Sequence, residues 1–246
     1  NQTIIMPKYL GKSDSYQAIN LDDVSLETIA RETNAAHELT GWDYWNAYEF
    51  MHLQNDEPVL ACLEIKIPCS SKFIIESKSM KLFLNKFFNQ DLEANEITSN
   101  LSKIFSEALD TNVDVNIIQQ YQGPPDFKPI NKNSGALVSE TIYRFQGYRS
   151  LCPVTSQPDF ANLFFFSENF NNLDSQVLLS IIKNHMHTQA FHEACIESIT
   201  YEILKVHETD LQVFGRFLRR GGIDINPLRC FNTTNPIFEN FREFNQ

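Results

Sequence analysis

A cysteine in a short loop between two prolines is the first candidate for chemistry in this sequence. Cys152 is followed directly by Pro153, and Pro158 and Asp159 come a few positions later. Neither proline can continue a helix and each restricts the local backbone, so the loop is typical of a constrained turn. A thiolate is a strong nucleophile, and a nearby carboxylate that handles its proton makes it useful near neutral pH. Cys152 and Asp159 are therefore a candidate nucleophile and proton-transfer pair; a buried cysteine in an ordinary turn is the alternative.

A second candidate is the tripeptide Phe191-His192-Glu193, which lies at the predicted start of a helix. The helix dipole favours a carboxylate in the first turn, so Glu193 has an alternative interpretation as a capping residue. In the functional interpretation, Glu193 accepts two N–H bonds from a guanine-like ring, with Phe191 beside the face of that ring. His192 then donates to a ring carbonyl or to a reacting nitrogen.

Two basic motifs are candidates for binding phosphate. The motif Glu76-Ser77-Lys78-Ser79, with Lys81 after it, offers hydroxyls, helix N–H groups and two ammonium groups. The motif Arg219-Arg220-Gly221-Gly222 follows a predicted strand, and paired guanidinium groups can bind a phosphate in bidentate fashion. A capped, solvated helix and an ordinary basic turn are the alternatives. Neither a Rossmann fingerprint nor a Walker loop is present, so any dinucleotide would bind by an unrelated mode.

The composition is that of an acidic globular protein. The 246 residues are 42% hydrophobic and 21% charged, with a net charge of −11. The length suits one large domain or two small ones. The negative charge argues against a general nucleic-acid binder, which needs a basic face. No apolar run reaches the roughly 18 residues that span a bilayer, and residues 1–12 lack the charged and apolar blocks of a secretory signal.

The cysteines and histidines favour neither a disulfide framework nor a metal site. The five cysteines are odd in number and irregular in spacing, which is typical of reduced thiols in a cytoplasm. Of the six histidines, His185 and His187 are the nearest pair, but residues two apart on a helix diverge. We therefore expect a cytoplasmic protein without a metal site.

The chain divides into two halves with the same order of predicted elements. In the first half we predict a hairpin, two helices and a strand, over Trp42–Leu53, Val59–Ile67, Ser79–Phe88, Leu92–Leu109 and Val113–Gln119. In the second half the same order is predicted over Leu137–Tyr148, Phe160–Ser167, Asp174–Met186, Phe191–Val206 and Leu211–Leu218. The Pro- and Gly-containing segment Tyr121–Ser134 is a predicted linker. Each half is thus a β-β-α-α-β unit of α+β class, an antiparallel sheet with two helices on one face and room for one more strand.

Taken together, these motifs resemble the long, bimodular form of 7-cyano-7-deazaguanine reductase, the NADPH-dependent nitrile reductase of queuosine biosynthesis. The resemblance is carried by the four motifs in order, with Asp224-Ile225-Asn226-Pro227 after the last, and extends from about Tyr9-Leu10-Gly11-Lys12-Ser13 to Pro227. It implies the tunnelling fold (T-fold), whose sheets carry helices on one side and assemble around a barrel. It further implies two tandem modules: residues 1–125 with the Glu-Ser-Lys-Ser motif, and residues 135–246 with the Cys/Asp and Phe-His-Glu motifs.

The resemblance also implies roles for individual residues. Cys152 corresponds to the nucleophile that adds to the nitrile of 7-cyano-7-deazaguanine (preQ0) and forms a thioimide, and Asp159 to the proton-transfer residue. The implied substrate contacts are His192 and Glu193, joined from the other module by Ile75, Glu76 and Ser77. The interpretation of the Phe-His-Glu motif from its residues adds Phe191. The implied NADPH contacts are Ser77, Lys78, Arg220 and Gly221, to which the arginine pair adds Arg219.

The implied reaction determines the cofactor demand. Conversion of a nitrile to an amine takes four electrons, so two NADPH molecules must bind in turn, and water must be kept from the thioimide. We expect preQ0 as the small-molecule partner, a homodimer, and no direct contact with nucleic acid or membrane. Two other functions are compatible with parts of the pattern, a thiol-dependent nitrile hydrolase and a purine- or pterin-binding protein without turnover. The segment between the modules is short for the long form, and residues after Arg229 match no motif.

Overall fold

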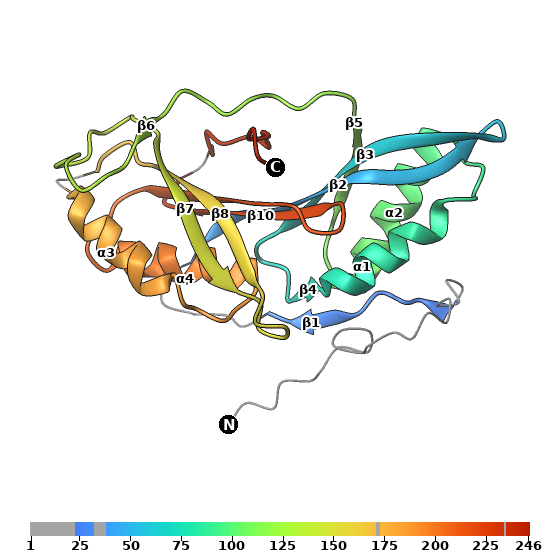
Figure 1. Cartoon of the computed structure of the whole chain (residues 1–246), viewed down its shortest axis with the longest axis horizontal. Helices are drawn as coiled ribbons and strands as arrows, with labels where there is room; N and C mark the ends of the chain where they lie inside the picture. The colour runs from blue at the N-terminus through green and yellow to red at the C-terminus, as the bar shows by residue number, and fades with distance from the viewer. Residues whose placement is uncertain (1–22, 32–37, 171–172, 234) are drawn as a thin grey trace.

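The computed structural model describes residues 23–31, 38–170, 173–233 and 235–246. Residues 1–22, which include the whole Tyr9–Ser13 motif, lie outside the described ranges. The main feature is an eight-stranded sheet in the order β5-β3-β2-β10-β9-β8-β7-β6 (Figure 1). Its strands are β2 (Thr40–Gln54), β3 (Glu57–Pro68), β5 (Asp114–Ile118), β6 (Lys128–Pro129), β7 (Tyr143–Leu151), β8 (Pro158–Phe166), β9 (Leu211–Phe217) and β10 (Ile223–Phe231). All neighbours are antiparallel except β6 and β7, and a separate two-stranded sheet pairs β1 (Thr28–Ala30) with β4 (Phe73–Ile75).

Two pairs of helices pack on one face of the large sheet, as the sequence predicts for each half. The first pair is α1 (Ser77–Leu84), continued by the 3₁₀ turn η2 (Asn85–Phe87), and α2 (Ala94–Leu109); the second is α3 (Ser175–His185) and α4 (His192–Leu204). Figure 1 shows the two pairs at opposite ends of the sheet. Each pair covers its own apolar core, one around Trp45, Leu63, Met80, Leu101 and Phe105 and the other around Leu163, Phe165, Ile196, Ile199 and Phe217.

Strand β10 joins the two halves into one sheet. It pairs with β2 from Ile223↔Ala47 to Cys230↔Thr40, and with β9 from Leu228↔Phe214 to Phe231↔Leu211. The sequence predicts an antiparallel sheet in each half, and the structure joins the strands of both halves in one eight-stranded sheet. The local pattern hides β10 because Pro227 and its polar neighbours interrupt the apolar alternation that marks a strand. Pro227 is tolerated because β10 pairs with β9 only from Leu228 onwards.

The other differences from the predicted elements are local. The strand predicted over Leu137–Tyr148 begins later in the structure, as β7 at Tyr143. Leu137 is apolar because it is buried in the core, but its N–H donates to Leu173 O, outside the large sheet. The predicted linker Tyr121–Ser134 contains the short strand β6. The β2–β3 hairpin is as predicted, and positive φ at Asn55 (53°) and Asp56 (62°) gives it the tight turn typical of two-residue hairpin loops.

The opposite face of the sheet is covered by residues 235–246, for which the sequence pattern predicts no structure. Phe238 and Phe241 pack against Tyr44, Phe164 and Phe214 in a third apolar core. In Figure 1 this segment, which ends at the C label, lies across the sheet from α4. Within the described ranges, no helix combines the length and apolar character needed to cross a membrane.

Candidate functional site

Cys152 lies at the end of the β7–β8 hairpin, in the constrained loop that the prolines predict. The pair Leu151↔Pro158 closes the hairpin, and the Cys152 N–H donates to Gln157 O at 2.9 Å. The loop returns through Ser156, whose φ is 56° and whose N–H donates to Cys152 O at 3.0 Å. Gln189 Nε2 braces the same loop from outside, donating to Ser156 Oγ at 3.0 Å. Cys152 is half-buried.

Asp159 is the second residue of β8 and is only 6% exposed. Its carboxylate has two partners: Arg220 Nη1 bonds to Oδ1, and His192 Nε2 lies 3.4 Å from Oδ2. Burial by itself would raise the pKa of Asp159, but the bonds from His192 and Arg220 outweigh burial and hold the pKa below its ordinary value. Asp159 is therefore a carboxylate at neutral pH, the form that can accept a proton.

The start of α4 is tied to the same hairpin. Leu151 donates to Thr188 O at 2.9 Å and accepts from Ala190 N at 3.1 Å, so the loop before the helix runs beside β7. Phe191 is the N-cap residue, and His192 begins the helix. The His192 ring stacks on Phe217, with centroids 3.9 Å apart and an angle of 10° between the planes. Its Nδ1 is buried without a hydrogen-bond partner among the described residues, which leaves this nitrogen for a ligand.

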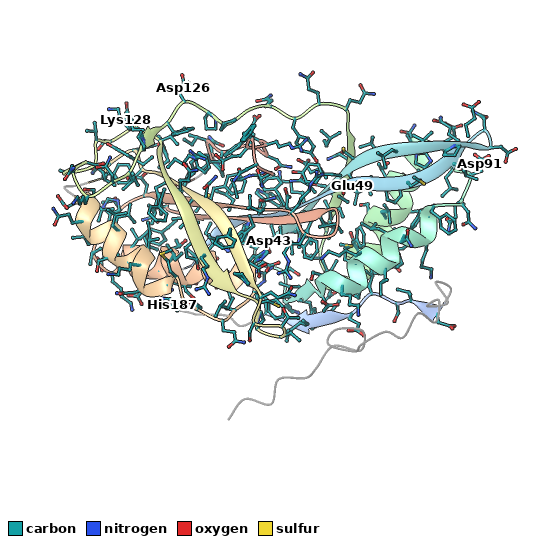
Figure 2. All side chains as sticks on the ribbon, in the orientation of Figure 1. Asp43, Glu49, Asp91, Asp126, Lys128 and His187 are labelled. Carbon is teal, nitrogen blue, oxygen red and sulfur yellow. The ribbon has the colours of Figure 1, made fainter. Side chains whose placement is uncertain are left out.

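Glu193 faces a cluster of buried charges at the seam between β2 and β10. The cluster centres on Asp43, which accepts from Arg31 Nη2 at 2.6 Å and from Arg229 Nη1 at 2.7 Å (Figure 2 labels Asp43). Glu193 is 3% exposed, and burial raises its pKa; the negative charge of Asp43 raises it further, while Arg31 and His192 act in the opposite direction. Because these side chains come from both halves, the surroundings of Glu193 are a product of the β2–β10 pairing.

The sequence motifs do not include Asp43, Arg31 or Arg229. Arg229 Nη2 and Arg31 Nη1 are buried and lack hydrogen-bond partners among the described residues, so donors remain unused beside Glu193. One signal was available in the sequence: Arg229 is a charged residue between Leu228 and Cys230, in a run of otherwise apolar residues. Such a residue is rarely buried unless it is paired.

Glu76 caps α1, as its alternative interpretation predicts. Its Oε1 accepts from Lys78 N at 2.8 Å and its Oε2 from Ser79 N at 2.7 Å, and the residue is 1% exposed. The preceding Ile75 is buried in β4. Ser77 and Lys78, the first two residues of α1, are partly exposed. The first half therefore presents a helix start and its basic residues at the seam.

Lys81 connects this helix with the hairpin of the second half. It is half-buried, and burial lowers the pKa of Lys81; the nearby Arg220 lowers it further, while Glu76, Asp159 and Cys152 raise it. The motif contains Lys81, but the predicted contacts omit it. Gly221 lies against it with φ 60°, and a Cβ at this glycine would come 3.2 Å from Lys81 Cδ.

The two arginines after β9 have different partners. Arg220 donates to Asp159 and to Gln157, both on the β7–β8 hairpin. Arg219 instead donates to Glu49 Oε1 at 2.6 Å, and its guanidinium lies 5.1 Å from the centre of the Tyr48 ring. Only Arg220 is therefore brought together with Asp159.

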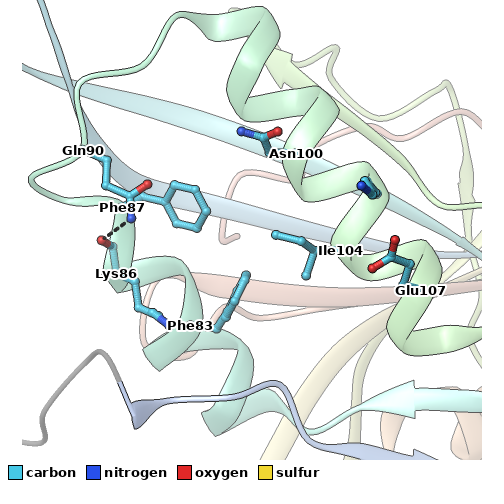
Figure 3. A pocket seen from close by; sticks show the side chains of 8 residues that line it. Phe83, Lys86, Phe87, Gln90, Asn100, Ile104 and Glu107 are labelled. Atoms are coloured by element: carbon cyan, nitrogen blue, oxygen red, sulfur yellow. Dashed lines mark hydrogen bonds between the residues drawn. The ribbon is translucent and has the colours of Figure 1, made fainter.

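Among the described residues, two of the cavities lie near the first half. The larger, of about 470 Å³, lies between the α1–η2 segment and α2 and is lined by Phe83, Lys86, Phe87, Gln90, Asn100, Lys103, Ile104 and Glu107 (Figure 3). None of the predicted site residues lines it. The smaller, of about 240 Å³, is bordered by Lys81, Gly221, Gly222 and Glu49 among others, so it adjoins the predicted cofactor contacts. In the described part of the chain, no group of three or more His, Cys, Asp or Glu residues is arranged to hold a metal ion.

Comparison with known proteins assigns relatives to both halves. A family model described as "Nitrile reductase, 7-cyano-7-deazaguanine-reductase N-term" matches residues 13–117, and one described as "QueF-like protein" matches residues 158–236. A protein of Coxiella burnetii (strain RSA 493 / Nine Mile phase I) is 32% identical, and the matched region covers 91% of this chain and 88% of the relative. A protein of Desulfotalea psychrophila is 31% identical, and the match covers 93% of each chain. A protein of Legionella pneumophila (strain Lens) is also 31% identical, and the match covers 93% of this chain and 91% of the relative. All three are named NADPH-dependent 7-cyano-7-deazaguanine reductase.

Proposed function

Because the chain belongs to the family of NADPH-dependent 7-cyano-7-deazaguanine reductases, we infer that it reduces the nitrile of preQ0 to the aminomethyl group of preQ1, a step of queuosine biosynthesis. It is an oxidoreductase that depends on NADPH. One observation supports this conclusion at the level of residues: Asp159 contacts both His192 and Arg220 beside the Cys152 loop. Lys81 of the other half lies close to them. The roles that follow are proposals for this chain.

We propose that Cys152 and Asp159 perform the covalent step. The carboxylate of Asp159 takes the Cys152 thiol proton, and the sulfur adds to the nitrile carbon. A carbon–sulfur bond forms, one carbon–nitrogen π bond is lost, and Asp159 returns the proton to nitrogen, which leaves a thioimide. The position of Asp159 supports this role, because the carboxylate follows the Cys152 loop directly in β8 and Arg220 bonds to both Asp159 and Gln157 of that loop. His192 and Arg220 orient the carboxylate.

Glu193 and its neighbours are proposed to hold the deazaguanine ring. A buried carboxylate can accept an N–H and an amino group from one edge of the ring together. The unpartnered Nδ1 of His192 supports a contact with a ring or nitrile atom. Phe191 lies at the start of the same helix. The remaining proposed contacts come from the first half: Ile75, Glu76 and Ser77.

The basic residues at the seam fit a cofactor with phosphate groups. Ser77, Lys78, Arg220 and Gly221 would hold NADPH, with Lys81 beside them and the smaller cavity next to Gly221. Arg219 remains a proposed contact, although Glu49 engages it here. When bound, NADPH supplies the hydride for each of the two reduction steps, and two molecules are used per preQ1.

The architecture supports a proposal about assembly. We propose that residues 1–125 and 135–246 are tandem T-fold modules, of which residues 1–22, 32–37, 171–172 and 234 lie outside the described range. The repeated order of two strands, two helices and a strand supports this division. Because sheets of this fold close around a barrel, a homodimer is the expected assembly. All five cysteines are free thiols, which supports a reducing compartment such as the cytoplasm.

The stoichiometry of NADPH oxidation tests the proposed function. Protein, preQ0 and NADPH are mixed, and oxidised nucleotide and preQ1 are both measured. Two NADPH molecules should be oxidised for each preQ1 formed, because the reduction takes four electrons. Loss of preQ0 without NADPH oxidation would identify a nitrile hydrolase instead, and binding of preQ0 without its loss would identify a ring-binding protein.

The substitution Arg220→Ala tests the electrostatic role of Arg220. Without this cation the pKa of Asp159 should rise towards its ordinary value, so Asp159 becomes protonated at a higher pH. The rate of thioimide formation should then begin to fall at a higher pH as acid is added, and the KM for NADPH should rise by roughly tenfold through loss of one phosphate contact. Stopped-flow measurement of adduct formation across pH checks the first effect. Arg219→Ala is the matched control, since Arg219 pairs with Glu49; an equal pH shift in both variants would contradict the role of Arg220.

A further inference from the structure

The ladder between β9 and β10 ends before the end of β9. Its last pair in this direction is Phe214↔Leu228, whereas β9 continues to Phe217. The Phe217 N–H donates to Asn226 Oδ1 at 3.0 Å, and Phe217 O accepts from Gln246 Nε2 at 2.9 Å. On its other side Phe217 pairs with Ala161 of β8, and on the β10 side two side-chain amides replace the missing strand partner. Buried backbone groups must be paired, so these amides hold this end of β9.

Gln246 is the centre of this arrangement. The residue is 4% exposed, and its Oε1 accepts from Arg216 Nε at 3.0 Å and from Glu243 N at 3.1 Å. Besides Phe217 O, its Nε2 faces Asn226 Oδ1 at 2.9 Å and Asp224 Oδ2 at 3.2 Å. The amide is therefore bonded on both sides, and its position is tightly determined.

The same strand residue reaches the candidate site on the other face of the sheet. The Phe217 ring stacks on His192 at 3.9 Å, and His192 Nε2 lies 3.4 Å from Asp159 Oδ2. A displacement of the Phe217 backbone would move the surface on which His192 rests. A chain of contacts thus runs from Gln246, through Phe217, to the imidazole beside Asp159.

We propose that Gln246, together with Asn226, is a positioning residue for nitrile reduction: it fixes Phe217 from the far face of the sheet and so holds His192 against Asp159. This inference rests on the proposed function. It gives a role to residues 235–246, which match none of the motifs. Their apolar anchors, Phe238 and Phe241, hold the segment on the sheet, and Gln246 transmits its position to the site.

The substitution Gln246→Met tests the inference, because it keeps the length of the side chain and removes all its hydrogen bonds. Stacking on Phe217 places the His192 ring protons in a ring current, so their NMR resonances report the stacking directly; a His192→Gln variant identifies them. In Gln246→Met these resonances should shift, and thioimide formation with preQ0 should slow by about tenfold or more. The KM for NADPH should stay within about twofold, since Arg220 and Lys81 are untouched.

Two controls separate positioning from stability. Leu101→Val removes one carbon from the separate apolar core of the first half, away from residues 235–246, so it should lower Tm and leave the His192 resonances in place. Asn245→Ala changes the exposed neighbour of Gln246 and should behave as the native protein. If Gln246→Met fails to fold, Gln246→Glu decides, because it keeps the acceptor for Arg216 and loses the donor to Phe217.

The outcomes distinguish this inference from the proposed function. Unchanged His192 resonances and an unchanged rate of adduct formation in a folded Gln246 variant would overturn the positioning role. An equal shift of the resonances in Leu101→Val would overturn it as well. If the native protein forms no adduct with preQ0 and oxidises no NADPH, the proposed function fails, whereas the His192 resonances of the variants still test the contact chain.

Discussion

Replacement of Cys152 by alanine should abolish both the covalent adduct with preQ0 and the oxidation of NADPH. Incubation of the native protein with preQ0 alone should add the mass of the ligand, and peptide mapping should place it on Cys152. Turnover should fall by a factor on the order of 10⁴ or more, as for removal of other enzymatic nucleophiles. The ring should still bind, because the proposed contacts of Glu193 and His192 are untouched. Mass spectrometry and a binding titration measure the two effects separately.

The surroundings of the other cysteines explain why they should not substitute for Cys152. Burial raises the pKa of Cys195 to about 11 and that of Cys230 to about 12, so almost no thiolate is present at neutral pH. Burial also raises the pKa of Cys62, which is only partly buried and is the matched control. Cys62→Ala should keep full adduct formation. An adduct that maps to Cys62 or Cys195 would remove Cys152 from its proposed role.

Replacement of Glu193 by leucine should weaken preQ0 binding by about 2–4 kcal/mol, taking a charge-assisted pair of hydrogen bonds as roughly twice a neutral one. The loss is large because the site excludes water, and the ring N–H groups would be left without an acceptor. The fold should remain intact. A carboxylate in the first turn of a helix contributes only about 0.3–1 kcal/mol through the dipole.

The raised pKa of Glu193 determines how stability and affinity should change with pH. A buried acid with a raised pKa binds a proton more readily in the folded than in the unfolded chain, so its contribution to stability falls as pH rises above its unfolded pKa. At neutral pH, Glu193→Leu should therefore lose little stability or gain some. The affinity of the native protein for preQ0 should decrease as pH falls through the raised pKa, because a protonated Glu193 can no longer accept two N–H groups.

Calorimetric titration with preQ0, beside thermal melts of the same variants, decides between the two interpretations of Glu193. The control is Glu197→Gln on the same helix: Glu197 Oε2 lies 3.5 Å from Arg229 Nε, and the proposed ring contacts do not include it. Its affinity for preQ0 should be close to native. A capping role alone predicts a small loss of stability and unchanged affinity in Glu193→Leu, and that result would exclude Glu193 from the site.

Local features of the sequence determined most of the elements and the positions of the motifs. Helices α2, α3 and α4 follow from apolar spacing, and the β2–β3 hairpin follows from its turn residues. The Cys152 loop follows from its prolines, and the cap at Glu76 follows from the preference of helix starts for an acceptor. These features depend on residues close in sequence, so pattern and propensity are sufficient to predict them. The roles of the motif residues stay predictions until the variants are measured.

Only the tertiary structure decided how the halves join and which charges meet. Strand β10 has no clear local pattern, since Pro227 interrupts its apolar alternation. It forms a strand because it pairs with β2, which is distant in sequence. Asp43 pairs with Arg229, which is 186 residues away in the sequence. Of the two neighbouring arginines, Arg220 and not Arg219 contacts Asp159. Gln246 lies beneath Phe217 because residues 235–246 cross the far face of the sheet. Partners so distant in sequence leave no periodic trace, since their pairing depends on which faces the fold buries together.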